Sequence, residues 1–143
     1  MTNIRLGIRT STTEIRYAVI DADKKEMLNK TDHRVKIAKN LNDSEIFQWL
    51  YKEIEEIIKQ YSVNKAIICE NAYGRDSKAL RLSNRLDAII VLALANHKIL
   101  SVIKVLNKKE DFIMEYAETH IGKTEKYWNK SIASCIVLAL GGN

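Results

Sequence analysis

Three features of the sequence predict an α/β fold, built on a mixed five-stranded sheet flanked by helices. Apolar residues alternate with polar ones over much of the first 37 residues, which is typical of antiparallel strands. From residue 42 the apolar spacing changes to three and four residues, which is typical of helices, and short apolar strands separate these helices. The 143 residues contain no proline and no internal repeat, so we expect a single domain over residues 1–143.

The N-terminal part of the chain predicts an antiparallel meander. A first strand spans residues 4–9 and is followed by a polar turn over 10–13. A second strand spans 15–21, and residues 26–37 carry a third, weaker strand. Because the connections are short, consecutive strands are expected to pair with each other.

The rest of the chain alternates helices with short apolar strands. Asn42, Asp43 and Ser44 offer N-cap residues before an apolar stripe that ends near Tyr61. The helix over this stripe allows the next strand, residues 63–69, to lie parallel to the first. The remaining predicted elements are a polar loop over 71–78, a helix over 80–98, a strand over 100–106, a helix over 108–120, a loop over 122–126 and a helix over 127–140. The predicted order is βββαβαβαα.

Composition limits the classes of protein that the chain can represent. The longest apolar run, residues 88–95, is too short to span a membrane, and the first residues have no apolar stretch of signal-peptide length, so we expect a cytoplasmic protein. Cys69 and Cys135 lie in apolar runs and are expected to be reduced core thiols. The net charge of +5 is compatible with a polyanionic partner.

The apolar run 88–95 also predicts how its helix is buried. A helix that is apolar nearly all round is buried on more than one side, either in the core or at a subunit contact. The sequence leaves both possibilities open, and the second would make the protein a homodimer.

Three stretches resemble, in the right order, the ribonuclease H-like superfamily, and most closely its RuvC-like resolvase and nuclease branch. Residues 6–21, LGIRTSTTEIRYAVID, resemble the opening hairpin, in which a Gly-Ile-Asp strand end precedes a Gly/Thr-rich turn. Residues 66–71, AIICEN, resemble the fourth strand with its terminal glutamate. Residues 129–140, NKSIASCIVLAL, resemble the last helix, which carries the closing acids. The resemblance implies a ribonuclease H-like fold for the whole chain and a place among small bacterial or phage RuvC-like proteins.

The resemblance also implies where catalytic carboxylates would stand. In such nucleases, carboxylates from separate elements bind two divalent metal ions that activate water. In this sequence the first-strand aspartate falls on Arg9, the fourth-strand glutamate on Glu70, and the closing acids on Ser131 and Ser134. We therefore interpret Glu70 as the remnant of a metal site, with no metal bound and with Arg9 paired to it. The alternative for Glu70 is a solvated acid at a strand end.

Other acids could complete a divergent site. A Mg²⁺-dependent nuclease would need Glu70 together with Asp21 or Asp87. However, Asp21 and Asp23 are typical of a turn, and Asp87 is expected to be an exposed helical acid. The three histidines lack carboxylate or cysteine neighbours at metal-ligand spacing and are expected to be structural or surface residues: His33, His97 and His120.

Basic residues cluster after Glu70. Four of them are spaced three, three and four residues apart and would share one stripe of a helix: Arg75, Lys78, Arg81 and Arg85. Such a stripe can contact a phosphate backbone, and Tyr73 could stack on a base. The alternative is a solvated helix face.

A second mixture of basic and aromatic residues lies near the C-terminus. Lys123, Lys126 and Lys130 flank Tyr127 and Trp128, and we expect Trp128 to anchor the core. Taken together, these features predict a RuvC-like protein that has lost its nuclease centre, needs no cofactor and binds nucleic acid. The alternatives are the divergent Mg²⁺-dependent nuclease and a protein-interaction subunit that binds no nucleic acid.

Overall fold

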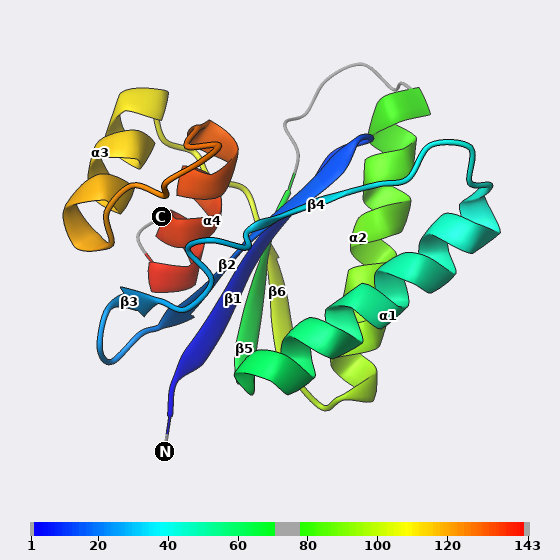
Figure 1. Cartoon of the computed structure of the whole chain (residues 1–143), viewed down its shortest axis with the longest axis horizontal. Coiled ribbons are helices and arrows are strands. Elements are labelled where there is room, and N and C mark those ends of the chain that lie inside the picture. The colour runs from blue at the N-terminus through cyan, green and yellow to red at the C-terminus, as the bar shows by residue number, and fades with distance from the viewer. Residues whose placement is uncertain (1, 71–77, 142–143) are drawn as a thin grey trace.

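One mixed β-sheet separates two layers of helices (Figure 1). The computed structural model describes residues 2–70 and 78–141. The strands are β1 (Ile4–Thr10), β2 (Glu14–Asp21), β3 (Glu26–Met27), β4 (Arg34–Lys36), β5 (Lys65–Cys69) and β6 (Leu100–Lys104). The helices are α1 (Asp43–Tyr61), α2 (Lys78–Asn96), α3 (Glu110–His120) and α4 (Lys130–Leu140).

The strand order confirms the predicted mixed α/β arrangement. The sheet runs β3-β2-β1-β5-β6, and β4 also pairs with β2. β1 and β2 are antiparallel, whereas β5 is parallel to β1 and β6 is parallel to β5. The helices α1 and α2 form the crossovers that parallel neighbours require.

The predicted third strand over residues 26–37 is wrong in one respect, because it is divided into β3 and β4. The Asn29 side chain interrupts it: its Oδ1 accepts a hydrogen bond from the Val19 amide at 2.7 Å, and its Nδ2 donates to the Tyr17 carbonyl at 3.0 Å. A side chain thus takes the place of a backbone ladder against β2. The sheet therefore has six strands rather than five.

Both faces of the sheet are covered. α1 and α2 pack on one face, and α4 packs on the other with α3 beside it (Figure 1). Successive residues of a strand face opposite sides of the sheet, and in the central strands both sides are buried, as at the neighbours Leu6 and Gly7. At Gly7 an added Cβ would lie 2.0 Å from the carbonyl oxygen of Cys135, so glycine is what allows α4 to approach β1 this closely.

The most secure helix of the sequence begins where its cap residues predict. Asn42 Oδ1 accepts a hydrogen bond from the Glu45 amide at 2.9 Å, and Glu45 Oε1 accepts one from the Asn42 amide at 3.1 Å. This reciprocal pair satisfies two amides that the first turn of α1 leaves free.

Within this chain, helix α2 is not buried on all sides. Leu86, Ile90 and Leu94 are fully buried, but Leu92 on the outer side is 50% exposed. The homodimer stays a prediction.

None of the helices within residues 2–70 and 78–141 combines the length and the apolar character needed to cross a membrane. Cys69 and Cys135 are both buried and free, as predicted.

Candidate functional site

The candidate site lies at the edge of the sheet where β1 and β5 end. These strands are parallel neighbours, with Ile8 opposite Ile68, so the residues that follow each of them meet at the same edge. Arg9 and Thr10 close β1, and Glu70 follows β5 directly. The amide of Glu70 donates to the carbonyl of Lys104 at 2.8 Å, which holds the end of β5 beside the end of β6.

Four charged side chains at this edge influence the pKa of the buried Cys69 thiol. Burial is the largest influence on Cys69 and raises its pKa. Arg9 and Lys130 lower the pKa of the Cys69 thiol, whereas Asp87 and Glu70 raise it. Two cations and two carboxylates, from four separate elements or their ends, therefore converge within electrostatic reach of one atom.

Asp87 contradicts the expectation of an exposed helical acid. Its side chain belongs to the buried stripe of α2, three residues before Ile90, and the residue is 5% exposed. Its Oδ1 accepts a hydrogen bond from Thr10 Oγ1 at 2.8 Å, which ties α2 to the end of β1. Burial raises the pKa of Asp87 to about 6, with Thr10 lowering it and Glu70 raising it further. The signal in the sequence is its spacing: Asp87 is four residues after the buried Ser83 and three before Ile90.

Glu70 lies within electrostatic reach of Asp87 rather than of the other candidate acid, Asp21. In the antiparallel β1–β2 pair Asp21 lies opposite Ile4, at the far end of the sheet from Glu70. Its Oδ1 accepts hydrogen bonds from the amides of Asp23 and Lys24, both at 3.1 Å, which confirms the predicted turn.

Arg9 lies at the predicted edge but does not hold Glu70 as predicted. Both residues act on the Cys69 thiol, yet the ion pairs among the described residues do not include one between Arg9 and Glu70. Each side chain is partly exposed, and water competes with direct contact at such positions. The predicted pair is therefore wrong at the level of a direct contact.

A cavity of about 40 Å³ opens beside Arg9. Ser131, at the start of α4, lines it together with Arg9 and Thr10. Ser134 does not reach this cavity, because it is buried in α4 and its Oγ donates to the Lys130 carbonyl at 2.7 Å. Of the two serines at expected acid positions, only Ser131 faces the site.

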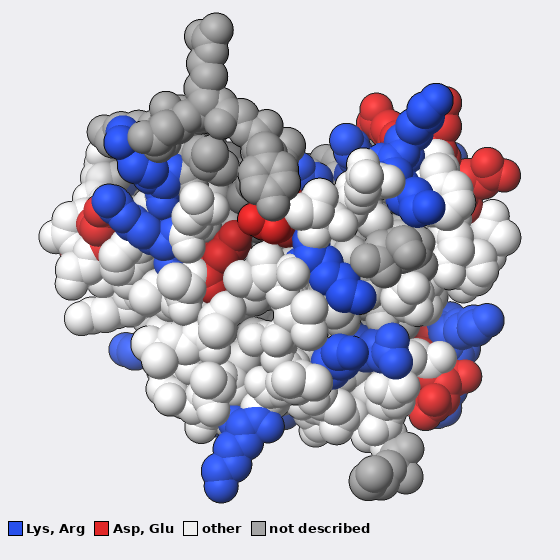
Figure 2. Space-filling model, turned by 180° about the vertical axis from the view of Figure 1, so that it is seen from behind, with Lys and Arg blue, Asp and Glu red and all other residues white. Residues whose placement is uncertain are grey.

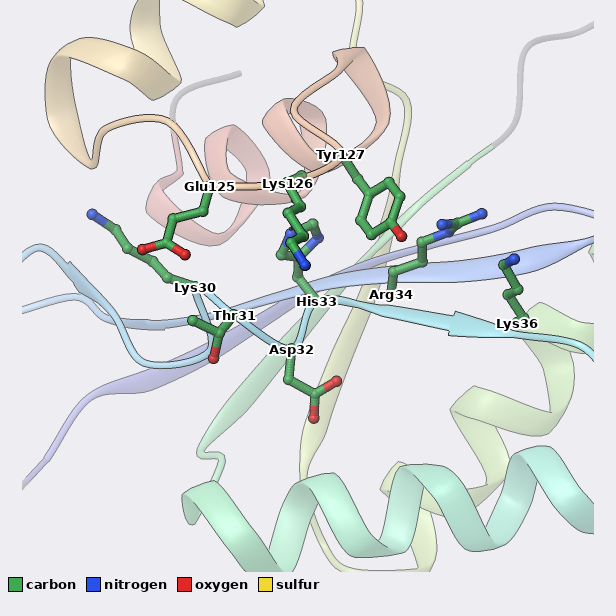
Figure 3. A pocket seen from close by; sticks show the side chains of 9 residues that line it. All are labelled: Lys30, Thr31, Asp32, His33, Arg34, Lys36, Glu125, Lys126 and Tyr127. Atoms are coloured by element: carbon green, nitrogen blue, oxygen red, sulfur yellow. Dashed lines mark hydrogen bonds between the residues drawn. The ribbon is translucent and has the colours of Figure 1, made fainter.

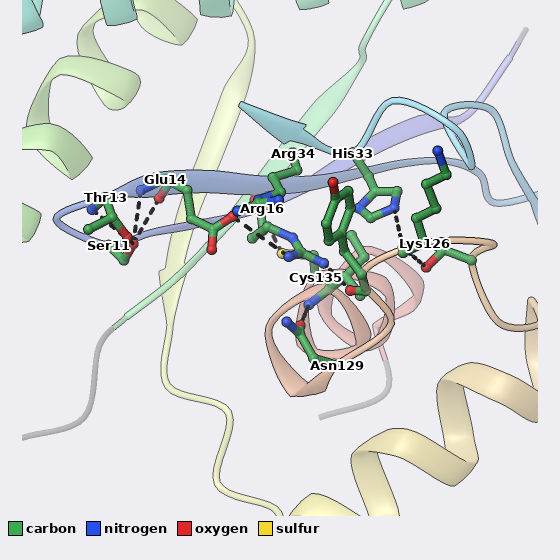
Figure 4. A network of polar contacts seen from close by, with 12 residues as sticks. Ser11, Thr13, Glu14, Arg16, His33, Arg34, Lys126, Asn129 and Cys135 are labelled. Carbon is green, nitrogen blue, oxygen red and sulfur yellow. Dashed lines mark hydrogen bonds and ion pairs between the residues drawn. The ribbon is translucent and has the colours of Figure 1, made fainter. Parts of the chain in front are cut away.

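A buried arginine forms the other wall of the same cavity (Figure 4). The Arg16 side chain is 4% exposed, and burial lowers the pKa of its guanidinium. Glu14 lies between Arg16, at 3.7 Å, and Arg34, with which it forms a hydrogen-bonded ion pair. Sequence reasoning missed these residues, although a charged residue inside the apolar run 15–21 was a usable signal.

Only part of the predicted basic stripe lies within the residues that the structure describes. Tyr73 and Arg75 lie outside the described residues, and Lys78 enters as the first residue of α2. Arg81 and Arg85 are exposed on that helix, and Arg85 forms an exposed ion pair with Asp43 at 3.5 Å. On the rear face, Lys and Arg side chains are spread over the surface, and acidic atoms lie in a hollow between them (Figure 2).

The donor set does not fit a two-metal nuclease centre within residues 2–70 and 78–141. No group of three or more His, Cys, Asp or Glu side chains is placed there to hold a metal ion. Glu70 and Asp87 supply two carboxylates, whereas Arg9 and Lys130 bring positive charge to the same edge. Two divalent ions need more carboxylate oxygen than this pair provides.

The order of strands and the packing of helices define a ribonuclease H-like fold of the RuvC type. The chain superimposes on the Thermus thermophilus RuvC structure with a TM-score of 0.80, at 12% identity, over 96% of this chain and 91% of that chain. It superimposes on T. thermophilus RuvC in complex with a Holliday junction substrate with a TM-score of 0.76, at 13% identity, over 96% and 90%. A crystal structure of the yeast mitochondrial Holliday junction resolvase matches with a TM-score of 0.66, at 10% identity, over 98% and 78%. No family model and no curated protein matches the sequence.

Proposed function

We propose that this protein binds branched DNA through the charged edge at which β1 and β5 end, and that this binding needs no metal ion. The observation that carries the proposal is the shared fold over 96% of the chain with a RuvC solved on a Holliday junction substrate. The residues at the same edge of this chain support binding more than hydrolysis, since Arg9 stands where the resemblance places the first catalytic aspartate.

Arg9 and Lys130 are the cations that this proposal assigns to the DNA backbone. They come from the end of β1 and the start of α4, and both lower the pKa of the buried Cys69 thiol. Phosphate contacts of this kind release counterions, and the resulting affinity depends on salt rather than on base sequence. The exposed Arg81 and Arg85 extend positive charge along α2.

The test is the salt dependence of binding to a four-way junction. For about three phosphate contacts, affinity should fall roughly 40-fold between about 50 and 200 mM salt. The double variant Arg9→Gln, Lys130→Gln should reduce the slope of log affinity against log salt by about two. Fluorescence anisotropy with a labelled junction measures both.

Lys59→Gln is the matched control, because Lys59 is an exposed lysine at the end of α1, on the other side of the sheet from α4. It should leave the slope unchanged. Binding by the wild type with no salt dependence, or equal effects of the double variant and Lys59→Gln, would contradict the proposed surface. Absence of any DNA binding would favour the protein-interaction subunit.

A divergent metal-dependent nuclease is the second candidate, and one observation favours it. Glu70 raises the pKa of the buried Asp87 carboxyl, so two acids from different elements lie close enough to interact. Such a pair could hold a single Mg²⁺ ion, which would supply Lewis-acid activation of water.

Thermal unfolding with and without metal separates the two candidates. Under the binding proposal, millimolar Mn²⁺ or Mg²⁺ should leave the unfolding midpoint within about 1 °C of its value in EDTA, because a ligand stabilises only when it binds the folded state. Under the nuclease alternative, metal should raise the midpoint, and both Glu70→Gln and Asp87→Asn should abolish the rise. Junction cleavage that depends on both acids would decide for the nuclease.

A further inference from the structure

A second, larger cavity lies beside the charged edge, between the segment 30–36 and the loop that precedes α4 (Figure 3). Its volume is about 380 Å³, within the range of pockets that hold small organic ligands. Its lining residues come from two parts of the chain about ninety positions apart: Lys30, Thr31, Asp32, His33, Arg34, Lys36, Glu125, Lys126 and Tyr127.

Tyr127 makes two contacts with arginines at this cavity, yet more than half of the residue is open to solvent. It has φ 58°, in the left-handed region that bulky residues rarely adopt. The buried Arg16 donates a hydrogen bond to its carbonyl, and the Arg34 guanidinium lies 4.3 Å from its ring centroid. The residue is nevertheless 56% exposed. An aromatic ring that is fixed in a strained backbone and left open to water is prepared for a planar ligand.

The charge around the ring is positive. The ammonium groups of Lys36 and Lys126 have no hydrogen bond or ion pair within the described residues, and the Lys126 side chain extends into the cavity over His33 (Figure 3). Asp32 points away toward α1 (Figure 3), where it raises the pKa of Tyr17 and of Tyr61.

The three remaining titratable groups of the lining change the positive charge around the Tyr127 ring little. Lys30 Nζ donates to the Ile121 carbonyl at 3.2 Å, at the end of the cavity where Glu125 lies (Figure 3). Burial, and then the nearby Arg16, lower the pKa of His33, so its ring is neutral at physiological pH. The positive charge near Tyr127 therefore comes from Lys36, Lys126 and the ion-paired Arg34.

We propose that this cavity binds one nucleotide of an unpaired strand, with the base stacked on Tyr127 and the adjoining phosphates of the strand contacted by Lys36 and Lys126, which lie on opposite sides of the ring (Figure 3). Base–aromatic stacking beside free lysines is the chemistry by which proteins hold single strands without reading their sequence. Arg16 and Glu14 line the small cavity beside Arg9. They also connect it to the larger cavity, because Arg16 donates to the Tyr127 carbonyl and Glu14 pairs with Arg34. A DNA strand bound at the charged edge reaches the cavity by continuing along β4, which carries Arg34 and Lys36. This inference rests on the proposed DNA binding.

Fluorescence anisotropy tests the inference with two four-way junctions, one with flush arms and one with a short single-stranded extension on one arm. The extension should raise the affinity of the wild type by roughly tenfold. Tyr127→Leu, which keeps an apolar side chain of similar bulk, should lose this gain, and Tyr127→Phe should keep it. Lys36→Gln with Lys126→Gln should reduce the gain, whereas Lys59→Gln should not. All variants should bind the flush junction within about twofold of the wild type.

The outcomes distinguish this inference from the proposed function. If the wild type binds the flush junction and gains nothing from the extension, the nucleotide site is overturned and the junction surface stands. If neither junction is bound, the proposed function fails first. If thymidine monophosphate competes for the cavity but an extension adds no affinity, the ligand is a free nucleotide and the strand assignment is overturned. Equal losses in Tyr127→Leu and Tyr127→Phe would also overturn stacking.

Discussion

Gly7→Ala should destabilise the fold by about 3 kcal/mol or more and lower the thermal unfolding midpoint by roughly 10 °C. The new Cβ would lie 2.0 Å from the Cys135 carbonyl oxygen and 2.9 Å from the carbonyl carbon. Both atoms belong to the backbone of α4, so no side-chain rotation relieves the collision. The helix must move away from β1, which opens the core on that face of the sheet. Urea unfolding followed by circular dichroism measures the loss.

Gly122→Ala is the matched control, because it makes the same chemical change without the collision. Gly122 has φ +104°, and its added Cβ would meet only the end of the Lys30 side chain, at 3.4 Å. Its cost should be limited to backbone strain, on the order of 1–2 kcal/mol. If Gly7→Ala proves no more destabilising than Gly122→Ala, α4 does not pack directly on β1.

Asp87→Asn should stabilise the protein above about pH 7 and have little effect near pH 4. The pKa of Asp87 is raised from 3.8 to about 6, chiefly by burial. The folded state therefore holds this proton over a pH range in which the unfolded state has lost it, and the stability of the wild type falls as pH rises through that range. At about 1.4 kcal/mol per pKa unit, the expected gain from the variant is about 1–3 kcal/mol. Urea unfolding at several pH values between about 4 and 8 measures the difference.

Two further variants sharpen this prediction. Asp23→Asn changes an exposed acid in the turn after β2 and should alter stability by less than about 0.5 kcal/mol. Thr10→Val removes the hydrogen bond that lowers the pKa of Asp87. The loss of stability with rising pH should therefore continue to a higher pH than in the wild type. A wild type and an Asp87→Asn variant with parallel pH profiles would mean that Asp87 is ionised without cost in the folded state. Mn²⁺ that removes the pH dependence would instead indicate metal bound at this carboxyl.

Local patterns were sufficient to predict most elements of the fold. The spacing of apolar residues and the Asn42 cap locate α1 within a residue of its observed start. The hairpin of β1 and β2 follows from alternation and a short polar turn. The last helix is less well predicted, since α4 begins at Lys130 rather than near 127. Asn129 explains the difference, because its side chain accepts a hydrogen bond from the Ile132 amide at 3.2 Å and caps the helix there.

The candidate site was predictable only in part. The strand-end position of Glu70 places it at the edge where β1 ends, and Arg9 and Ser131 line one small cavity there, whereas the catalytic roles that the resemblance implies for these positions stay predictions. Asp87 was misjudged because an acid on a helix is usually solvated, and its buried neighbours outweighed that tendency. Glu14 and Arg16 gave weak signals, since their importance comes from contacts with Arg34 and with the loop before α4.

The sequence by itself determined most of the order of the elements and the single mixed sheet, because these depend on residue type and on spacing along the chain. Only the tertiary structure decided which charges meet. Asp87 faces Thr10 across 77 positions of sequence, and Lys126 meets His33 across 93. Contacts of this kind depend on how elements far apart in the sequence pack against each other on the two faces of the sheet, which the spacing of residues along the chain does not specify.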